Sequence, residues 1–260
     1  MQKRYALIRT LSILALLFVG ATLHSAQLPD NETLNYKVLF KWGLIQKQAG
    51  RATMKLNNTP NTFEATLYAR SEPWADHIYS LRDTLLSTFS RHDLAPIKYQ
   101  RIAHEDGKYA HDIVEFIRTG NTFVGDCTRF RRNKKNQPTN IAHTTLKAEG
   151  MTVDMLSVFY FLRTLDFKSM KEGDSHSVNI FSGKRKETLT IKFIGNESLK
   201  LDNVTYPTHR ITFTFTTEGS KKSSDGIETW IWANESKIPL KLEGRLKVGK
   251  IKCLYMADKK

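Results

Sequence analysis

The chain has 260 residues and a formal net charge of +14, with 40% hydrophobic residues and two cysteines. One long apolar run occurs, near the N-terminus, and the lack of a second excludes a protein with several membrane-spanning helices. The basic balance favours anionic neighbours such as phospholipid head groups, acidic glycans or nucleic acid.

Residues 1–26 have the features of a cleavable secretory signal peptide. Three basic residues and no acidic one precede or border an apolar run over residues 11–23. This run is shorter than the roughly 20 residues that a bilayer core requires. A basic start, a short apolar centre and small residues after it are typical of export signals, here with cleavage after Ala21 or Ala26. We expect an exported, periplasmic or envelope-associated protein; an uncleaved N-terminal anchor is the alternative.

Residues 27–260 are expected to form a single β-rich domain without an integral membrane span. Because three basic residues lie in the signal, this part carries a net charge of +11. Export makes nucleic acid the least expected anionic partner. A division into two domains near residues 131–140 is the alternative.

Most of this domain alternates between apolar and polar residues with period two, as half-buried strands do. In residues 36–42, for example, Tyr36, Val38, Phe40 and Trp42 share one face. The expected strands cover residues 36–42, 49–56, 62–69, 78–91 as one long bent strand, 97–104, 109–118, 122–130, 177–181, 188–194, 205–216, 227–233, 239–246 and 250–256.

Turn residues separate these strands. Residues 57–61 form a turn by composition, and Asp106-Gly107 predicts a tight hairpin. Gly50, at a strand start, predicts a bulge or a close approach of two backbones. Residues 131–140 are polar and basic and are expected to form an exposed loop.

One helix is expected, over residues 153–165. Asp154 or Thr152 can cap its N-terminus. Leu156, Phe159, Tyr160 and Leu162 give it a wide apolar surface, which needs to be buried. The sequence therefore predicts a mainly β fold: an antiparallel, strongly curved sheet or open barrel with one main helix packed at its concave side.

No catalytic residue, metal site or cofactor is predicted. The eight histidines show no metal-ligand spacing, and neither cysteine has a neighbouring cysteine or histidine. No Gly-x-Ser-x-Gly nucleophile elbow or phosphate-binding glycine loop occurs. For Cys127 and Cys253, two unpaired buried thiols are the simpler interpretation, and a disulfide, which export would permit, is the alternative.

Five aromatic residues are candidates for contact with an apolar or amphipathic ligand. They are Trp42, Phe159, Tyr160, Trp230 and Trp232. Aromatic side chains line pockets for acyl chains and stack on sugars. They also fill hydrophobic cores, and this second interpretation stays open.

The densest basic segment is a candidate for contact with an anionic surface. Its basic residues are Arg129, Arg131, Arg132, Lys134 and Lys135, with Phe130 among them. Such a segment can dock on anionic lipid head groups; a solvated loop is the alternative.

Four carboxylates, Glu72, Asp76, Asp83 and Asp93, lie close together in the sequence. Two carboxylates facing one cleft would suit glycoside hydrolysis. Their spacing in an extended chain does not bring them to a common cleft, so an enzyme acting on glycan is a secondary hypothesis.

Several segments in order resemble the exported bacterial family known as domain of unknown function 3108. The segments are 36–45 with 49–52, 105–109, 154–163, Gly173-Asp174, 229–232 and 237–243, and the resemblance covers about residues 33–256. It implies a periplasmic or outer-surface protein without an established enzymatic activity, and a more distant similarity to the open-barrel lipoprotein carriers of the periplasm. The chain departs from the family pattern at residues 233–237, where a more acidic turn and an arginine are expected.

The leading hypothesis is therefore a non-enzymatic envelope protein that binds a lipid or another amphipathic ligand on a curved sheet. The alternatives are an envelope scaffold or partner of an export machine without a small ligand, and an enzyme acting on glycan. A cavity would favour the lipid-binding protein. A filled core with an exposed apolar patch would favour the scaffold, and a cleft with two facing carboxylates would favour the enzyme.

Overall fold

The computed structural model describes residues 28–133, 137–246 and 249–257. The expected signal peptide, with both cleavage points, lies outside the described residues, as do Lys134 and Lys135. The elements are β1 (Asn31–Trp42), β2 (Ile45–Asn58), β3 (Thr62–Ser71), α2 (Pro73–Asp76), β4 (Leu81–Ser90), β5 (Pro96–Glu105), β6 (Lys108–Thr119), β7 (Thr122–Arg132), β8 (Asn140–Glu149), β9 (Thr152–Asp154), α3 (Ser157–Thr164), β10 (Ser175–Phe181), β11 (Lys186–Leu201), β12 (Val204–Thr217), β13 (Ile227–Trp232), β14 (Pro239–Arg245) and β15 (Lys250–Met256).

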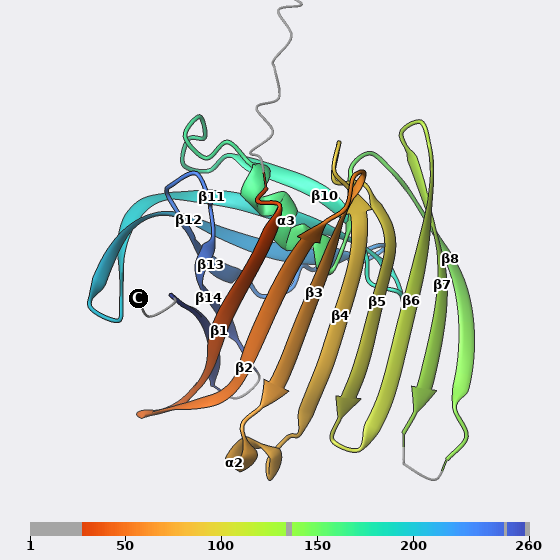
Figure 1. Cartoon of the computed structure of the whole chain (residues 1–260), viewed down its shortest axis with the longest axis horizontal. Coiled ribbons are helices and arrows are strands. Elements are labelled where there is room, and N and C mark those ends of the chain that lie inside the picture. The colour runs from red at the N-terminus through yellow and green to blue at the C-terminus, as the bar shows by residue number, and fades with distance from the viewer. Residues whose placement is uncertain (1–27, 134–136, 247–248, 258–260) are drawn as a thin grey trace, which may run out of the picture.

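All the described strands belong to one sheet, in the order β8-β7-β6-β5-β4-β3-β2-β1-β15-β14-β13-β12-β11-β10-β9. Neighbouring strands are antiparallel except β9 and β10, which are parallel. Figure 1 shows β1–β8 side by side in one curved wall. In this view α3 and β10–β12 lie behind the wall. The predicted fold class, an antiparallel curved sheet with one main helix on its concave side, is confirmed.

The sheet rolls up until one end overlaps the other. Phe181, at the end of β10, stacks on Phe116 of β6 with ring centroids 5.6 Å apart. A Cβ atom added to Gly125 of β7 would lie 2.6 Å from the Phe181 ring. The edge strands β9 and β10 therefore pack against the inner face of the wall, which covers an edge that would otherwise be free for pairing.

Helix α3 lies in the space enclosed by the rolled sheet and separates two apolar clusters. Tyr160 packs on Phe89 of β4, with ring centroids 5.6 Å apart. Leu162 belongs to the other cluster, with residues of β10–β13 such as Ile180 and Ile211. Because α3 contacts both sides, the interior is filled by side chains at its level.

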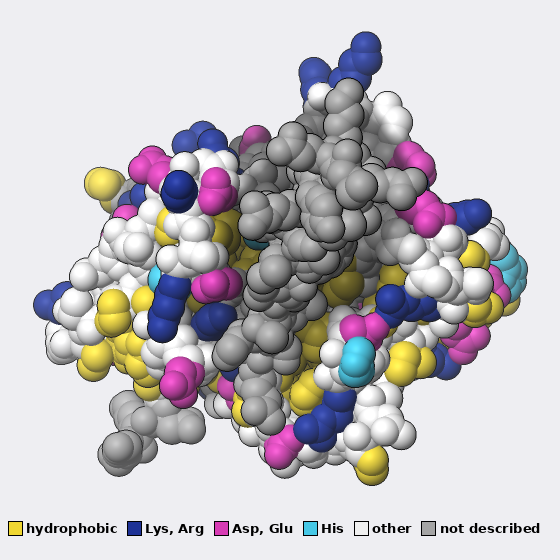
Figure 2. Space-filling view, turned by 90° about the horizontal axis from the view of Figure 1, so that it is seen from above, with side chains coloured by type: hydrophobic (Ala, Val, Ile, Leu, Met, Phe, Trp, Pro, Cys, Tyr) yellow, Lys and Arg dark blue, Asp and Glu magenta, His cyan; other side chains and the backbone are white. Residues whose placement is uncertain are grey.

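Two polar anchors hold α3. Asp154 Oδ1 accepts the backbone N–H groups of Leu156 and Ser157, at 2.7 and 2.8 Å. The N-cap residue of α3 is Leu156 rather than the predicted Asp154 or Thr152, but Asp154 binds the backbone at the start of the helix. At the other end, Arg163 is 1% exposed and forms a two-point ion pair with Glu32 of β1. Seen from above, the described side chains at this end are a mixture of apolar, basic and acidic groups (Figure 2).

Local turn predictions are also confirmed. β5 ends at Glu105 and β6 begins at Lys108, with positive φ at Asp106 (48°) and Gly107 (76°), as a two-residue hairpin requires. The pairing of β1 with β2 has a bulge at Ala49, which has no partner on β1 and precedes Gly50. A Cβ atom at Gly50 would lie 2.7 Å from the Arg70 carbonyl oxygen, so two backbones do approach closely there.

Some expected boundaries are wrong. The strand expected over residues 78–91 is β4, which begins only at Leu81, because α2 (Pro73–Asp76) and a turn come between β3 and β4. The helix expected over 153–165 is α3, with β9 before it. The strand β8 was not expected, and β7 continues through Arg132, so the first two residues of the expected loop over 131–140 belong to a strand.

The two cysteines are unpaired. Cys127 is on β7 and Cys253 on β15, in separate parts of the sheet. Burial raises the pKa of each thiol to about 11, so both stay protonated near neutral pH. The simpler interpretation, two unpaired thiols, agrees with the structure.

Candidate ligand-binding site on the inner face

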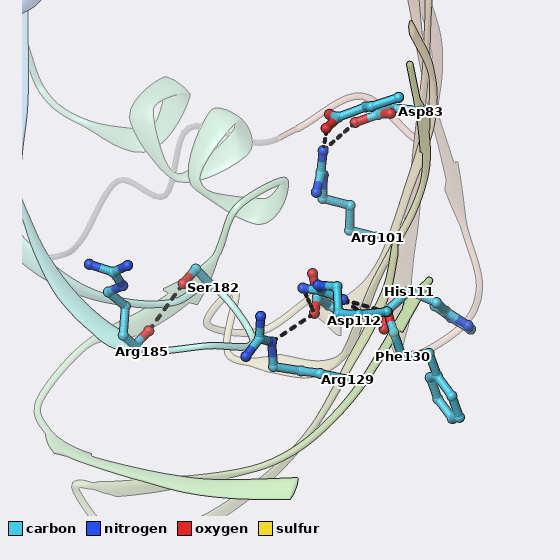
Figure 3. Close-up of polar contacts among 10 residues, drawn as sticks. Asp83, Arg101, His111, Asp112, Arg129, Phe130, Ser182 and Arg185 are labelled. Atoms are coloured by element: carbon cyan, nitrogen blue, oxygen red, sulfur yellow. Dashed lines mark hydrogen bonds and ion pairs between the residues drawn. The ribbon is translucent and has the colours of Figure 1, made fainter. Parts of the chain in front are cut away.

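Charged residues replace apolar ones on the inner face of β4–β7, beyond the level of α3. Arg101 of β5 lies directly opposite Asp112 of β6, and Asp112 lies opposite Arg129 of β7. Strand alternation puts these residues on the same face as the buried Tyr99, Val114 and Cys127. Figure 3 shows Arg101 and Arg129 extending inward from the wall, whereas His111 and Phe130 point to the other side.

Asp112 is the centre of the first charged group. Its Oδ1 atom accepts from Arg129 Nε at 3.2 Å and from Arg131 Nη2 at 2.5 Å, and only 4% of the residue is exposed. Gly183, in the turn between β10 and β11, covers it: an added Cβ there would lie 3.0 Å from the Asp112 Cβ. Two guanidinium groups thus share one buried carboxylate, which fixes their positions.

Arg101 is the centre of the second charged group. Its Nη2 atom donates to Asp83 Oδ2 at 2.7 Å and also to Glu105. Burial raises the pKa of Asp83, the Arg101 charge opposes this shift, and the nearby Glu105 carboxylate adds to it. The second oxygen, Asp83 Oδ1, is buried and has no hydrogen-bond partner among the described residues.

One arginine of each group has N–H donors that form no hydrogen bond with the described residues. Arg101 Nε and Nη1 and Arg129 Nη1 and Nη2 have no hydrogen-bond partner within the described part of the chain. The two side chains are 30% and 19% exposed, respectively. Guanidinium groups held by carboxylates with free N–H groups are well suited to an anionic oxygen ligand.

Apolar side chains continue the same inner face on the other side of Arg101. Leu85 of β4 lies directly opposite Arg101, and Leu67 of β3 lies opposite Leu85. Met54 of β2, opposite Leu67, is buried, whereas Ala52 lies two residues along β2, opposite Ala69. Val38 of β1 lies opposite Cys253 of β15. Five of these apolar residues are only half-buried: Leu85, Leu67, Ala52, Val38 and Cys253. The inner wall is therefore amphipathic, with an apolar strip that adjoins the arginines.

The five predicted aromatic residues do not line one site. Phe159 and Tyr160 lie together in α3, with ring centroids 5.4 Å apart, and Tyr160 is buried. Trp42 is 61% exposed at the end of β1. Trp230 is buried between Lys241 and Arg210, at 3.7 and 5.4 Å from its ring centroid, and Trp232 packs edge-on against Tyr206. The structure thus brings two of the five together at the inner face.

The predicted basic segment is divided between the two faces of β7. Arg129 and Arg131 point inward to Asp112, so the expectation that this segment is a solvated loop or a surface contact is wrong for them. Arg132 faces outward, with its guanidinium 5.3 Å from the Tyr109 ring centroid. The alternation of a strand that continues through Arg132 is the reason.

The four carboxylates considered for glycoside hydrolysis are each paired with an arginine. Glu72 binds Arg51, Asp76 binds Arg82, Asp83 binds Arg101 and Asp93 binds Arg118. Of these, Asp83 faces the interior, whereas Glu72 and Asp76 flank α2 at the strand ends. The four groups do not meet in one cleft.

Sequence reasoning missed Arg101 and Asp112 as site residues. The signal was present in residues 109–118, where Ala110, Asp112, Val114 and Phe116 share one face of the strand. A carboxylate in an otherwise apolar row requires a buried partner. No group of side chains suited to hold a metal ion occurs among the described residues. Nor does any helix among them have the length and apolarity to cross a membrane.

Comparison with solved structures supports the fold. The chain is similar to a crystal structure of a beta-barrel-like protein of domain of unknown function DUF1849 from Brucella abortus, with a TM-score of 0.57 and 10% sequence identity. The match covers 88% of this chain and 97% of that one. No curated protein sequence matches the chain.

The family model described as Protein of unknown function (DUF3108) matches residues 35–254, which include β2–β8 in full and β1 from Asn35 onward. On this match over most of its length, the chain belongs to the DUF3108 family.

Proposed function

We propose that this protein is a non-enzymatic envelope protein that binds an amphipathic anion on the inner face of its rolled sheet. The charged group of the ligand would contact Arg101 and Arg129, and its apolar part would lie along Leu85, Leu67 and Ala52. Export through the N-terminal signal belongs to the same proposal, because it would expose the protein to lipids and other amphiphiles of the envelope.

The observation that carries the proposal is the row Arg101–Asp112–Arg129. The buried carboxylate of Asp112 accepts from Arg131 and from Arg129, and the Nη1 and Nη2 groups of Arg129 have no partner within the described residues. Burial of part of an arginine without using its donors costs free energy unless water or a ligand satisfies them. The half-buried strip next to this row supplies the apolar contact that a lipid or fatty acid needs.

A fluorescent fatty-acid probe tests the proposal. We expect wild-type protein to bind the acid form more tightly than its methyl ester, because only the acid carries a carboxylate. The double variant Arg101→Gln/Arg129→Gln should lose about tenfold in affinity, which corresponds to about 1.4 kcal/mol. Titration of probe fluorescence, with thermal melts to verify folding, measures both.

Arg132→Gln is the matched control, since Arg132 lies on the same strand but on the outer face. It should bind the probe as wild type does. Equal affinity for acid and ester, or an unchanged affinity in a folded double variant, would contradict the proposal.

An envelope scaffold without a small ligand is the second candidate. The observation that favours it is the filled interior at the level of α3, where Tyr160, Phe89 and Tyr99 are fully buried. Under this hypothesis no form of the protein binds the probe, so the same titration separates the two functions.

A further inference from the structure

A row of basic residues crosses the outer face of the wall. Along the strand register, Lys37 of β1 lies opposite Arg51 of β2, Arg51 opposite Arg70 of β3, Arg70 opposite Arg82 of β4, and Arg82 opposite His104 of β5. Like charges placed directly opposite each other on neighbouring strands destabilise a sheet. Three arginines opposite one another on neighbouring strands therefore lower the stability of the sheet. Their presence indicates a role other than folding.

Carboxylates at the strand ends position part of this row. Arg51 Nε donates to Glu72 at 2.7 Å, and Arg82 Nη2 donates to Asp76 at 2.6 Å. Hydrogen bonds from Arg51 and Arg82, respectively, lower the pKa of Glu72 and of Asp76, so both carboxylates stay ionised. Arg70, between the two, is exposed and has no hydrogen bond or ion pair with any described residue.

The row lies in a hollow of the outer face rather than on a flat surface. The hollow has a volume of about 660 Å³ and its lining includes Arg51, Arg70, Arg82, Tyr68 and Lys55. Tyr68 is 50% exposed and belongs to the next row, opposite Thr84. The surface thus offers a line of cations beside an exposed aromatic ring.

We propose that this hollow binds an extended acidic polysaccharide, with successive carboxylates on the guanidinium groups of Arg51, Arg70 and Arg82. Neighbouring strands are about 4.8 Å apart, so the five basic residues extend over about 19 Å in a line. Regularly spaced charges along a line match a chain that carries one anionic group per sugar. Arginine binds carboxylates through paired N–H groups, and Tyr68 can stack on a sugar ring.

The shape argues against a lipid surface as the occupant. A bilayer is flat and broad, whereas Arg51, Arg70 and Arg82 line a hollow of the sheet surface. The site is also on the opposite face of the sheet from Arg101 and Arg129, so this proposal is independent of the one for the inner face.

Calorimetric titration of the whole exported chain with a galacturonate hexamer tests the proposal. We expect binding that weakens as salt is raised from 50 to 300 mM, because exposed charges are screened, and no binding of a neutral glucose hexamer. Arg70→Glu should lower the affinity at least tenfold. Because Arg70→Glu replaces two like-charge contacts across the strands by opposite-charge ones, it should not lower the melting temperature.

Lys192→Glu is the matched control, an exposed lysine on β11 without a partner among the described residues. It should bind the hexamer as wild type does. Failure of the wild-type protein to bind, or equal losses in Arg70→Glu and Lys192→Glu, would overturn the proposal. So would binding to phosphatidylglycerol vesicles that depends on Arg70 without binding to the hexamer, which would assign the hollow to a membrane surface.

Discussion

At the scale of single residues, Asp154 links the helix to the wall through a buried carboxyl group. Its Oδ2 atom accepts from Ser87 Oγ of β4 at 2.6 Å, while Oδ1 accepts the backbone N–H groups of Leu156 and Ser157 at the start of α3. Burial raises the pKa of Asp154, and its hydrogen bonds with Ser87 and the first turn of α3 only partly oppose this shift. Because the folded state favours the protonated form, this residue reduces stability as pH rises above the ordinary carboxyl pKa of 3.8.

Asp154→Asn should therefore remove a pH-dependent cost. The amide retains an oxygen for the start of α3 but does not ionise, so the free energy of unfolding of the variant relative to wild type should increase between pH 4 and pH 8. Asp154→Ala is the comparison: it removes the same carboxyl and also the oxygen that binds the start of α3, so it should be about 1 kcal/mol less stable than Asp154→Asn at any pH. Urea unfolding at several pH values measures these differences. A constant difference between Asp154→Asn and wild type would show that the carboxyl does not titrate in this range.

At the scale of elements, α3 has one side that is fully buried in the interior and another that is only half-buried. Tyr160 is 1% exposed and packs on Phe89, whereas Phe159 is half-buried and meets Tyr36 edge-on at 6.4 Å. We expect Tyr160→Ala to cost about 3–5 kcal/mol, as for a fully buried aromatic residue, and Phe159→Ala clearly less.

Chemical denaturation of the two variants separates these roles of the helix. If Phe159→Ala also changes the affinity for the fatty-acid probe, the exposed side of α3 contributes to the inner-face site. Equal costs for the two substitutions would mean that α3 only fills the interior.

At the scale of the whole molecule, the overlap of the two ends of the sheet depends on Gly125. Because Gly125 has no side chain, the Phe181 ring fits against its backbone. Any other residue type would place a Cβ atom too close to this ring, so the ring or the backbone would have to move. Gly125→Ala should destabilise the protein by about 1–3 kcal/mol, the cost of overpacking.

Phe181→Leu in the same chain should recover part of that loss. A double-mutant cycle from thermal melts measures the coupling between the two positions. Additive effects would indicate that β10 does not pack on β7. Gly120→Ala is unsuited as a control because Gly120 has a positive φ of 59°, whereas Gly244→Ala, where an added Cβ has only ordinary contacts, should be tolerated better.

The edge strand β8 shows where prediction from local pattern fails. Its residues 140–145 are exposed on both faces, and only Leu146 and Ala148 are buried. A strand that buries so few residues carries no period-two signal, so the sequence did not reveal it. The same applies to β9, whose three residues are all buried and therefore do not alternate.

The sequence by itself determined the local structure: the alternating strands, the Asp106-Gly107 hairpin, the close approach at Gly50 and a helix that begins close to Asp154. Each depends on residues near each other in the chain or on one face of one strand. Only the tertiary structure decided which charges meet. Arg129 and Asp112 are paired by strand register, and Arg51, Arg70 and Arg82 align across three strands. Register is set by turns, bulges and packing of the whole sheet, so both candidate sites appear only once the sheet has formed.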